Sequence, residues 1–300
     1  MSTAARSRAA DLAMISPPKA PVLLVNPRSG GGKAQHHDLV GRCRAWGIEP
    51  LTLEPGDDIS AVATAAVLHG ADVIGMAGGD GSQAAAAAVA AEHDLPYVVV
   101  PAGTRNHFAL DLGADPDDVV GALAAFFGGK ERRVDLARVN GRVFVNNASM
   151  GLYGSLVQSR QYRDAKLKTA IGMLPELLGP RAEPFDLRFT DPEGSEHVGA
   201  QLLLVSNNRY ELHPLRAQGA RGKMDKGTLG VVAVHPAPPP SRQVWEWTTP
   251  EFRVSSGGLV DVGLDGEAVT LEPPLVFESL PSALRARTND QEHRGKNRGG

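Results

Sequence analysis

Short apolar runs alternate with helical segments through the first part of the chain. The runs PVLLV, IEPLTL, ADVIGM and PYVVVP have the length of buried strands. Helical patterns occur over residues 35–46, 59–69 and 116–128, and in the alanine-rich segment that follows Ser82. Strands that alternate with helices in this way predict a parallel sheet with crossover helices, arranged as a doubly wound α/β domain.

Near residue 133 the pattern changes to short segments in which apolar and polar residues alternate. VDLARV and RVFVNN flank Asn140-Gly141, a dipeptide typical of a two-residue hairpin, and FDLRF, QLLLVSNN and GTLGVVAVH follow. These segments predict an antiparallel β-sandwich. We therefore expect an α/β domain over residues 21–133 and a β-sandwich domain over residues 134–273. The ends, residues 1–20 and 285–300, are predicted to be disordered.

Two segments of the second domain differ in composition from the rest. Residues 159–178, SRQYRDAKLKTAIGMLPELL, form one helical pattern with basic residues first and apolar residues last. The pattern fits a helix that rests on an anionic membrane and equally a helix that covers the core of the sandwich. The proline-rich PAPPP at residues 236–240 is typical of a rigid connector.

Composition limits the classes of function. The chain has 300 residues, and its hydrophobic content of 42% is enough for a substantial core, while a net charge of -3 argues against bulk binding of nucleic acid. The single cysteine, Cys43, excludes an internal disulfide, and the scattered histidines do not predict zinc. The N-terminus lacks a continuous apolar region, and no run approaches the roughly 20 apolar residues of a membrane span. A cytoplasmic protein, soluble or peripheral to the membrane, is expected.

Three glycine-bearing loops follow three of the predicted strands: NPRSGGGK, AGGDGS and PAGTRN. The first lacks the spacing of a P-loop, because Lys33 is followed by Ala34 and not by Ser or Thr. Taken singly, each loop can be a phosphate-binding loop, or it can have a purely structural role as a connector or a strand-to-helix turn. Glycine lets backbone N–H groups converge on an anion, and a helix N-terminus adds partial positive charge. Because parallel strands end at one edge of the sheet, the three loops together predict a phosphate-binding site there.

Two acidic positions have a structural reading as well as a chemical one. Asp265-Gly266, followed by Glu267, lies between LVDVGL and AVTL, where a type I′ hairpin turn favours Asp-Gly. Asp135 within VDLARV is equally consistent with a carboxylate on an edge strand. The residues alone leave both readings open.

A series of motifs occurs in a fixed order along the chain: NPRSGGGKA, TLEPGD, AGGDGS, VPAGTRNHFALDLG, VDLARVNGRVFVNNASMGLYG, SNN, DKGTL and LDGE. Over residues 22–274 this series resembles the diacylglycerol kinase catalytic family, which includes bacterial lipid kinases and sphingosine and ceramide kinases. The resemblance implies a nucleotide-binding α/β domain similar to those of NAD kinases and phosphofructokinases. It also implies a β-sandwich domain with the site in the cleft between the two, and a segment near residues 274–284 that returns to the first domain.

The resemblance implies roles for individual residues. Glu267 matches the proposed catalytic base of the family, and Asp80 matches the acid beside the reacting hydroxyl or magnesium. Asp80, Asp135 and Asp225, the last within the loop 223–228, match acids of the metal network, so ATP and Mg²⁺ are the expected cofactors. The residues that match the nucleotide loops are Asn26, Ser29, Thr52, Gly78, Gly79, Asp80, Gly81, Ser82, Gly103, Thr104 and Asn106.

Three positions depart from the family pattern. Ser82 stands where Thr is common, which keeps the hydroxyl, and Ala85 stands where Glu is common. His107 replaces an aspartate in the third loop, and His is a poorer ligand for Mg²⁺ than Asp. These changes predict a rearranged metal network or slow turnover.

The sequence therefore predicts a lipid kinase that transfers the ATP γ-phosphate to a hydroxyl of a diacylglycerol-like lipid at the inner face of the membrane. One alternative is a catalytically weak or inactive nucleotide- or lipid-binding regulator of the same fold. A second is an NAD kinase, which the segment VDLARVNGRVFVNN and the LDGE motif disfavour. The lipid head group and the oligomeric state, a homodimer included, are left open.

Overall fold

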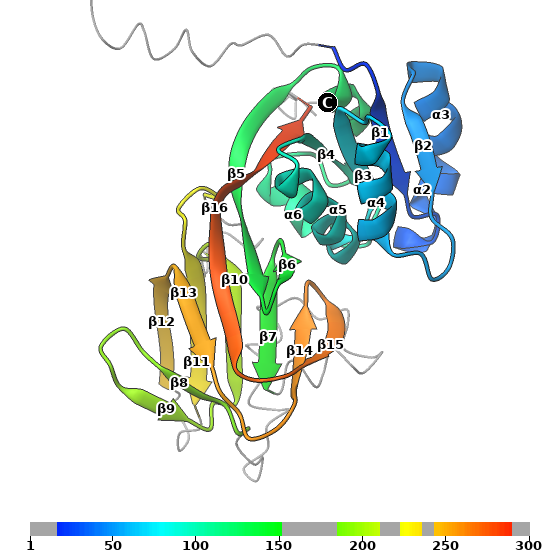
Figure 1. Cartoon of the computed structure of the whole chain (residues 1–300). Helices are drawn as coiled ribbons and strands as arrows, with labels where there is room; N and C mark the ends of the chain where they lie inside the picture. The colour runs from blue at the N-terminus through cyan, green and yellow to red at the C-terminus, as the bar shows by residue number, and fades with distance from the viewer. Residues whose placement is uncertain (1–16, 152–184, 211–222, 236–242, 290–300) are drawn as a thin grey trace, which may run out of the picture.

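The computed structural model describes residues 17–151, 185–210, 223–235 and 243–289, which form an α/β part and a β-rich part joined by long strands (Figure 1). The helix predicted over residues 159–178, the connector over 236–240 and most of the two predicted tails lie outside the described residues. Within the described ranges, no helix has both the length and the apolar character needed to cross a membrane.

Four parallel strands form the centre of the α/β part, in the order β2-β1-β3-β4. Their bounds are β1 (Pro21–Val25), β2 (Glu49–Thr52), β3 (Val73–Gly78) and β4 (Pro96–Pro101). The inner strands β1, β3 and β4 are buried at every residue, as expected of strands that are covered on both faces. Their apolar runs are continuous for this reason.

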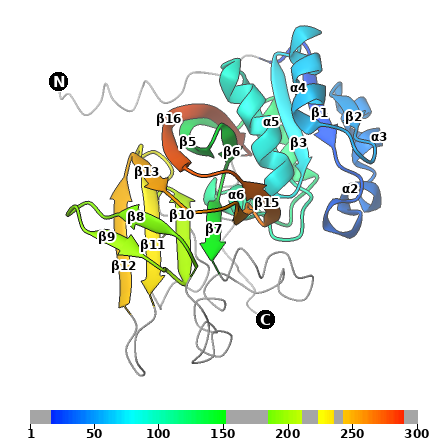
Figure 2. The same cartoon turned by 60° about the horizontal axis from the view of Figure 1, so that its bottom comes forward.

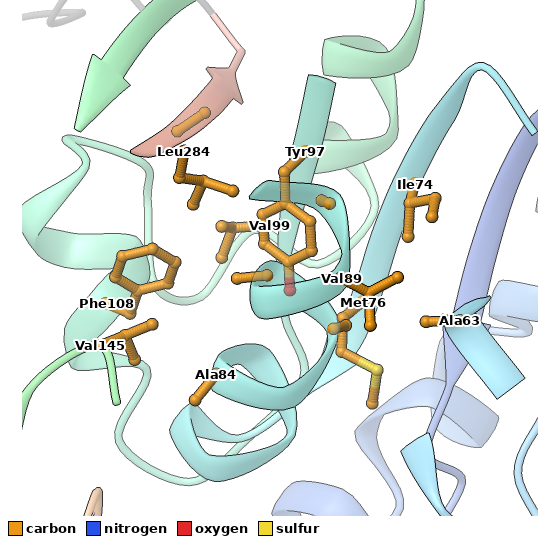
Figure 3. Packing of buried hydrophobic residues seen from close by; sticks show 14 of the residues in the cluster. Ala63, Ile74, Met76, Ala84, Val89, Tyr97, Val99, Phe108, Val145 and Leu284 are labelled. Carbon is orange, nitrogen blue, oxygen red and sulfur yellow. The ribbon is translucent and has the colours of Figure 1, made fainter. Parts of the chain in front are cut away.

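Helices cover both faces of this sheet. Their bounds are η2 (Ser29–Gly31), α2 (Lys33–His36), α3 (Leu39–Trp46), α4 (Ile59–Leu68), α5 (Asp80–Glu92), α6 (His107–Asp111) and η3 (Gly121–Phe126). One core contains residues of α4, α5 and α6, where Ile74, Met76 and Tyr97 pack against the alanine-rich helix α5 (Figure 3). A second core, on the opposite face, contains Leu39 of α3 and Phe126 of η3. The predicted doubly wound α/β architecture is confirmed.

Two predicted helices differ from the observed ones. The segment 35–46 is not one helix, because Asp38 has a φ of 47° and separates α2 from α3. This break lets Ala34 and Leu39 both enter the core below the sheet. The segment 116–128 contains the short 3₁₀ helix η3, in which Leu123 and Phe126 are fully buried at the three-residue spacing of that helix.

A six-stranded antiparallel sheet, in the order β12-β11-β10-β7-β14-β15, forms one layer of the second part. The bounds are β7 (Asn147–Gly151), β10 (Leu202–Asn207), β11 (Leu229–His235), β12 (Gln243–Thr249), β14 (Val260–Leu264) and β15 (Glu267–Leu271). Facing it are β6 (Arg142–Phe144), β13 (Glu251–Val254) and the near halves of β5 (Lys130–Val139) and β16 (Leu275–Thr288). The two layers enclose one apolar core, which confirms the predicted β-sandwich. A separate hairpin of β8 (Arg188–Thr190) and β9 (Glu196–Val198) packs at its side.

Both hairpins expected from Asn-Gly and Asp-Gly are present. Asn140 and Gly141 have φ of 45° and 81°, and they join β5 to β6. Asp265 and Gly266 have φ of 49° and 87°, and they join β14 to β15. Positive φ at both central residues defines the type I′ turn, which L-residues other than Asn and Asp adopt with difficulty.

The strand β16 connects the two parts. Phe277–Leu280 pair antiparallel with residues 136–139 of β5, and after a register shift Leu284–Thr288 pair with residues 130–134. Residues 285–287 also pair in parallel with β4, so the last part of β16 lies inside the α/β sheet between β4 and β5. In Figures 1 and 2 the β5–β16 pair runs from one part into the other.

The boundaries expected for the domains differ from this arrangement in two places. The predicted division at residues 133–134 falls inside β5, and the predicted tail from residue 285 begins inside β16, which ends at Thr288. The sequence of this strand looks polar because it contains Arg285 and Arg287. In the structure both arginines bind Glu131, while the alternating residues Leu284 and Ala286 are buried. At the other end of the chain, the N–H groups of residues 19 and 20 donate to Asp72.

Candidate active site

The three glycine loops meet at the carboxyl ends of β1, β3 and β4. A Cβ placed on Gly103 would lie 2.5 Å from Cα of Gly79, so the second and third loops are in backbone contact. A Cβ on Gly30 would overlap with the carbonyl oxygen of Ala102, so the first loop touches the third. Side chains larger than hydrogen would separate these loops. The structure therefore brings together the three segments that sequence spacing placed at one edge.

Gly103→Ala is expected to push the second and third loops apart and to destabilise the fold by about 1–3 kcal/mol, the usual cost of overpacking. The free energy of nucleotide binding should change by more than the free energy of unfolding, because the loops that would bind the nucleotide lose their relative position. Gly128→Ala is the matched control, since a Cβ there would meet no atom within 4 Å. Urea unfolding and nucleotide titration measure both effects. Equal behaviour of the two variants would contradict the predicted role of the glycine contact.

Asn106 shapes the third loop from within. Its Nδ2 group donates to the carbonyl oxygens of Pro101, Gly103 and Pro116, at 2.9, 3.1 and 2.9 Å. Its Oδ1 accepts the N–H of Gly103 at 2.8 Å, and its backbone has a φ of 49°. The amide is therefore engaged by the protein, where sequence analysis predicted a contact with phosphate or ribose. Thr104, in the same loop, is exposed to solvent.

Gln83 supports the second loop, and sequence analysis did not identify it. Its buried Nε2 group donates to the carbonyl oxygens of Met76 at 2.9 Å and Val100 at 3.1 Å, so it links the ends of β3 and β4. Its Oε1 accepts the hydroxyl of Tyr97 at 2.6 Å. The one sign of it in the sequence was a single amide directly before an alanine run. Ser82 is buried beside it, and a Cβ on Gly78 would lie 2.9 Å from Cβ of Ser82.

The first loop is held in a tight conformation. Oδ1 of Asn26 accepts the N–H of Arg28 at 3.1 Å, and the carbonyl oxygen of Ser29 accepts the N–H of Gly32. Residues 30–32 follow with φ of 57°, 71° and 88°, values that favour glycine at all three positions. Thr52 ends β2 opposite Val25, which places its exposed side chain at the same edge of the sheet.

Asp80 joins the first turn of α5 to the start of α6. Its Oδ2 accepts the N–H of His107 and its Oδ1 accepts the N–H of Phe108, both at 3.2 Å. The carboxylate is partly buried at the loop edge. The residue that departs from the family pattern, His107, therefore lies directly beside the acid that the resemblance places at the reaction.

Glu267 reaches this place from the other part of the molecule. A Cβ on Gly81 would overlap with Oε1 of Glu267 and would lie 2.6 Å from its Cδ. The carboxylate of Glu267 thus lies against the first turn of α5, one residue from Asp80 in sequence. Figure 2 shows β15, which Glu267 begins, close to α6. Asp80 and Glu267, which are 187 positions apart, thus lie at the same turn of the structure.

Asp265 anchors the hairpin that carries Glu267. Its Oδ2 accepts the N–H of Val145 at 2.8 Å, and its Oδ1 accepts those of Asn146 and Asn147 at 2.8 and 3.1 Å. Burial raises the pKa of Asp265 to about 7, and the negative charge of Asp80 acts in the same direction, while the three N–H groups oppose them. The Asp-Gly pair in the sequence predicted the turn correctly but gave no sign of this anchoring.

The raised pKa of Asp265 predicts a pH dependence of stability. Between about pH 4 and 7 the folded state holds this proton more tightly than the unfolded state, so its contribution is lost as the pH rises through about 7. The free energy of unfolding of the wild type minus that of Asp265→Asn is therefore expected to be more positive near pH 5 than near pH 8. Urea unfolding without divalent metal measures it. A difference that is constant or grows with pH would be inconsistent with this assignment.

The residues fit a bound Mg²⁺ only in part. Mg²⁺ is usually held by one or two carboxylates together with phosphates and water, and Asp80 beside the glycine loops meets that requirement. Asp225 is exposed on the loop 223–228, with the ammonium of Lys226 at 3.8 Å. Asp135 is buried, and both of its carboxylate oxygens accept N–H groups of the protein. Across the described ranges, no group of three or more His, Cys, Asp or Glu is arranged to hold a metal.

Fold and site together define a class of protein in which an α/β domain with glycine loops meets an acidic hairpin of a β-sandwich. Residues 20–139 match the family model described as the diacylglycerol kinase catalytic domain, which confirms the predicted resemblance.

Individual relatives agree with this assignment. A diacylglycerol kinase of Mycobacterium tuberculosis (strain CDC 1551 / Oshkosh) is 32% identical over 195 residues, which cover 61% of this chain and 62% of the relative. A diacylglycerol kinase of Staphylococcus aureus (strain JH9) is 28% identical over 224 residues, or 71% of this chain and 69% of the relative. The crystal structure of a diacylglycerol kinase from Bacillus anthracis str. Sterne matches with a TM-score of 0.67 and 21% identity, over 92% of this chain and 99% of that chain. The structural match supports the fold.

Proposed function

We propose that the protein is a lipid kinase that transfers the γ-phosphate of ATP to the hydroxyl of a diacylglycerol-like lipid. The observation that carries the proposal is the contact between Glu267 and Gly81, which places a carboxylate of the β-sandwich against the first turn behind the GGDG loop. The names of the relatives, diacylglycerol kinases, support the same substrate class.

The proposed roles follow from the geometry. The N–H groups of the converged glycine loops and the N-terminus of α5 bind the phosphates. Glu267 accepts the proton of the lipid hydroxyl. The hydroxyl oxygen then forms a bond to the γ-phosphorus, and the bond between the γ-phosphorus and the leaving ADP breaks. Asp80, held by the N–H groups of α6, faces the reacting phosphate, and Mg²⁺ would neutralise phosphate charge there. Asp265 holds the hairpin that presents Glu267.

The lipid would reach this site at the cytoplasmic face of a membrane, with the protein bound peripherally. The test is a total lipid extract incubated with the purified protein and Mg·ATP, followed by mass analysis of phosphorylated lipids. A diacylglycerol-type product is expected.

The same incubation distinguishes the alternatives. His107 beside Asp80 is the observation that favours a regulator with little or no catalysis, since the family pattern has an aspartate there. Thermal stabilisation by nucleotide without any phosphorylated lipid would support that regulator and contradict the kinase. Formation of NADP from NAD and ATP would instead indicate an NAD kinase.

A further inference from the structure

Asp135 lies at the junction of the two parts, and its carboxylate is used by the protein itself. The side chain is almost completely buried, at 1% exposure. Its Oδ1 accepts the N–H of Ser282 at 2.7 Å, and its Oδ2 accepts the N–H of Gly227 at 2.6 Å and the amide of Asn208 at 3.1 Å. Donors from three separate segments therefore converge on one carboxylate. Such hydrogen bonds stabilise a carboxylate that has left water.

Ser282 lies at the point where β16 passes from one core to the other. The register with β5 shifts between Leu280 and Leu284, and Ser282 has a φ of 52°. Phe277, before the shift, belongs to the core of the sandwich, while Leu284, after it, belongs to the core of the α/β part. In Figure 3, Leu284 packs in the same cluster as Phe108 of α6. The hydrogen bond from Ser282 to Asp135 thus fixes the bulge at which the strand pair crosses the junction.

A set of hydrogen bonds leads from this bulge to Asp265, in the hairpin that carries Glu267. Asn207 is fully buried, and its Nδ2 group donates to the carbonyl oxygens of Asp135 at 2.8 Å and Val145 at 3.2 Å. Its backbone N–H donates to the carbonyl oxygen of Asn146 at 2.9 Å. Residues 145–147 in turn donate their N–H groups to Asp265, which begins the turn before Glu267.

We infer that Asp135 is a positioning residue, whose carboxylate sets where the Glu267 hairpin meets the α5 turn. It does so through its direct hydrogen bond to the β16 bulge and through Asn208, whose Nδ2 group donates both to that carboxylate and to Oδ1 of Asn207 at 3.2 Å. The inference assigns to Asp135 a role in place of the metal ligation that the sequence resemblance implied. It rests on the proposed function only for its kinetic consequence, because the hydrogen bonds are independent of any reaction. The sequence motifs SNN and VDL are explained by this network.

Asp135→Asn in the full chain tests the inference. Asparagine keeps one acceptor oxygen and replaces the other by an NH₂ group, so either Ser282 or Gly227 loses its acceptor. Amide exchange at the residue that loses its acceptor is expected to be at least about tenfold faster, by the same factor with Mg²⁺ and with EDTA. The kcat for lipid phosphorylation should fall about 100-fold while the KM for ATP changes less than about twofold, as for a misplaced base.

Asp225→Asn is the matched control. It removes an exposed carboxylate from the same loop as Gly227, and the exchange rate at Ser282 should stay at the wild-type value. An effect of Asp135→Asn that appears only with Mg²⁺, or unchanged exchange at both Ser282 and Gly227, would overturn the inference. If Asp135→Asn does not fold, amide exchange in the wild type is the test. Protection of the Ser282 and Gly227 amides from exchange should be equal with Mg²⁺ and with EDTA. Protection that requires Mg²⁺ would overturn the inference. Exchange rates remain decisive even if no lipid is phosphorylated.

Discussion

Glu267→Gln is expected to lower kcat for lipid phosphorylation by about 10²–10⁴-fold, the usual contribution of a general base. Glutamine preserves the size of the side chain that lies against Gly81 and cannot accept the hydroxyl proton at neutral pH. The glycine loops are untouched, so nucleotide affinity should change less than about twofold. Initial rates with mixed-micelle lipid and nucleotide titration by calorimetry measure the two quantities.

Glu272→Gln is the control for this substitution. Glu272 is an exposed glutamate just beyond β15, on the same hairpin, and its change should leave kcat at the wild-type level. A Glu267→Gln protein that retains wild-type turnover would remove the base from the proposed mechanism. A loss of nucleotide affinity equal to the loss of kcat would indicate that Glu267 acts in binding and not in the chemical step.

Truncation after Ala283 is expected to abolish folding of the α/β part. The truncation removes Leu284–Thr288, the part of β16 that pairs with residues 130–134 of β5, and residues 285–287 of it also pair with β4. Leu284 and Ala286 are both fully buried, so their loss opens the core as well as two strand edges. Arg285 and Arg287 also bind Glu131 at 2.8 and 2.6 Å, and the truncation removes both ion pairs.

Truncation after Asn289 is the control, because it leaves β16 complete. Yield of soluble protein and cooperative thermal unfolding followed by circular dichroism distinguish the two proteins. The longer protein should unfold cooperatively and the shorter should not. A shorter protein with the unfolding transition of the wild type would show that the C-terminal strand is dispensable.

The periodicity of the sequence predicted most of the architecture, because local preferences agree with the fold in those places. Buried parallel strands appear as continuous apolar runs, and Asn140-Gly141 and Asp265-Gly266 each specify a type I′ turn through their own backbone preferences. The strand β16 was only partly predicted. Its arginines looked like the start of a polar tail, and the partner that neutralises them, Glu131, lies more than 150 positions away.

The site was predicted less completely than the fold. The alternation of strands and helices placed the three glycine loops at one edge of the parallel sheet. The order of the family motifs added Glu267 to the predicted site. The roles of Gln83, Asn106 and Asp135 depend on hydrogen bonds to backbone groups of other segments, and no local pattern encodes such partners. Hydrogen-bond donors and acceptors of this kind become evident only when strands and loops are placed in space. Whether His107 slows turnover stays a prediction from the sequence.

Transfer of labelled γ-phosphate from ATP to diacylglycerol in mixed micelles tests the central claim most directly. Purified protein with Mg²⁺ should form labelled phosphatidate, and the Glu267→Gln protein should form about 10²–10⁴-fold less at the same nucleotide occupancy. Absence of labelled lipid from a wild-type protein that is folded and binds ATP would contradict the assignment of this chain as a lipid kinase.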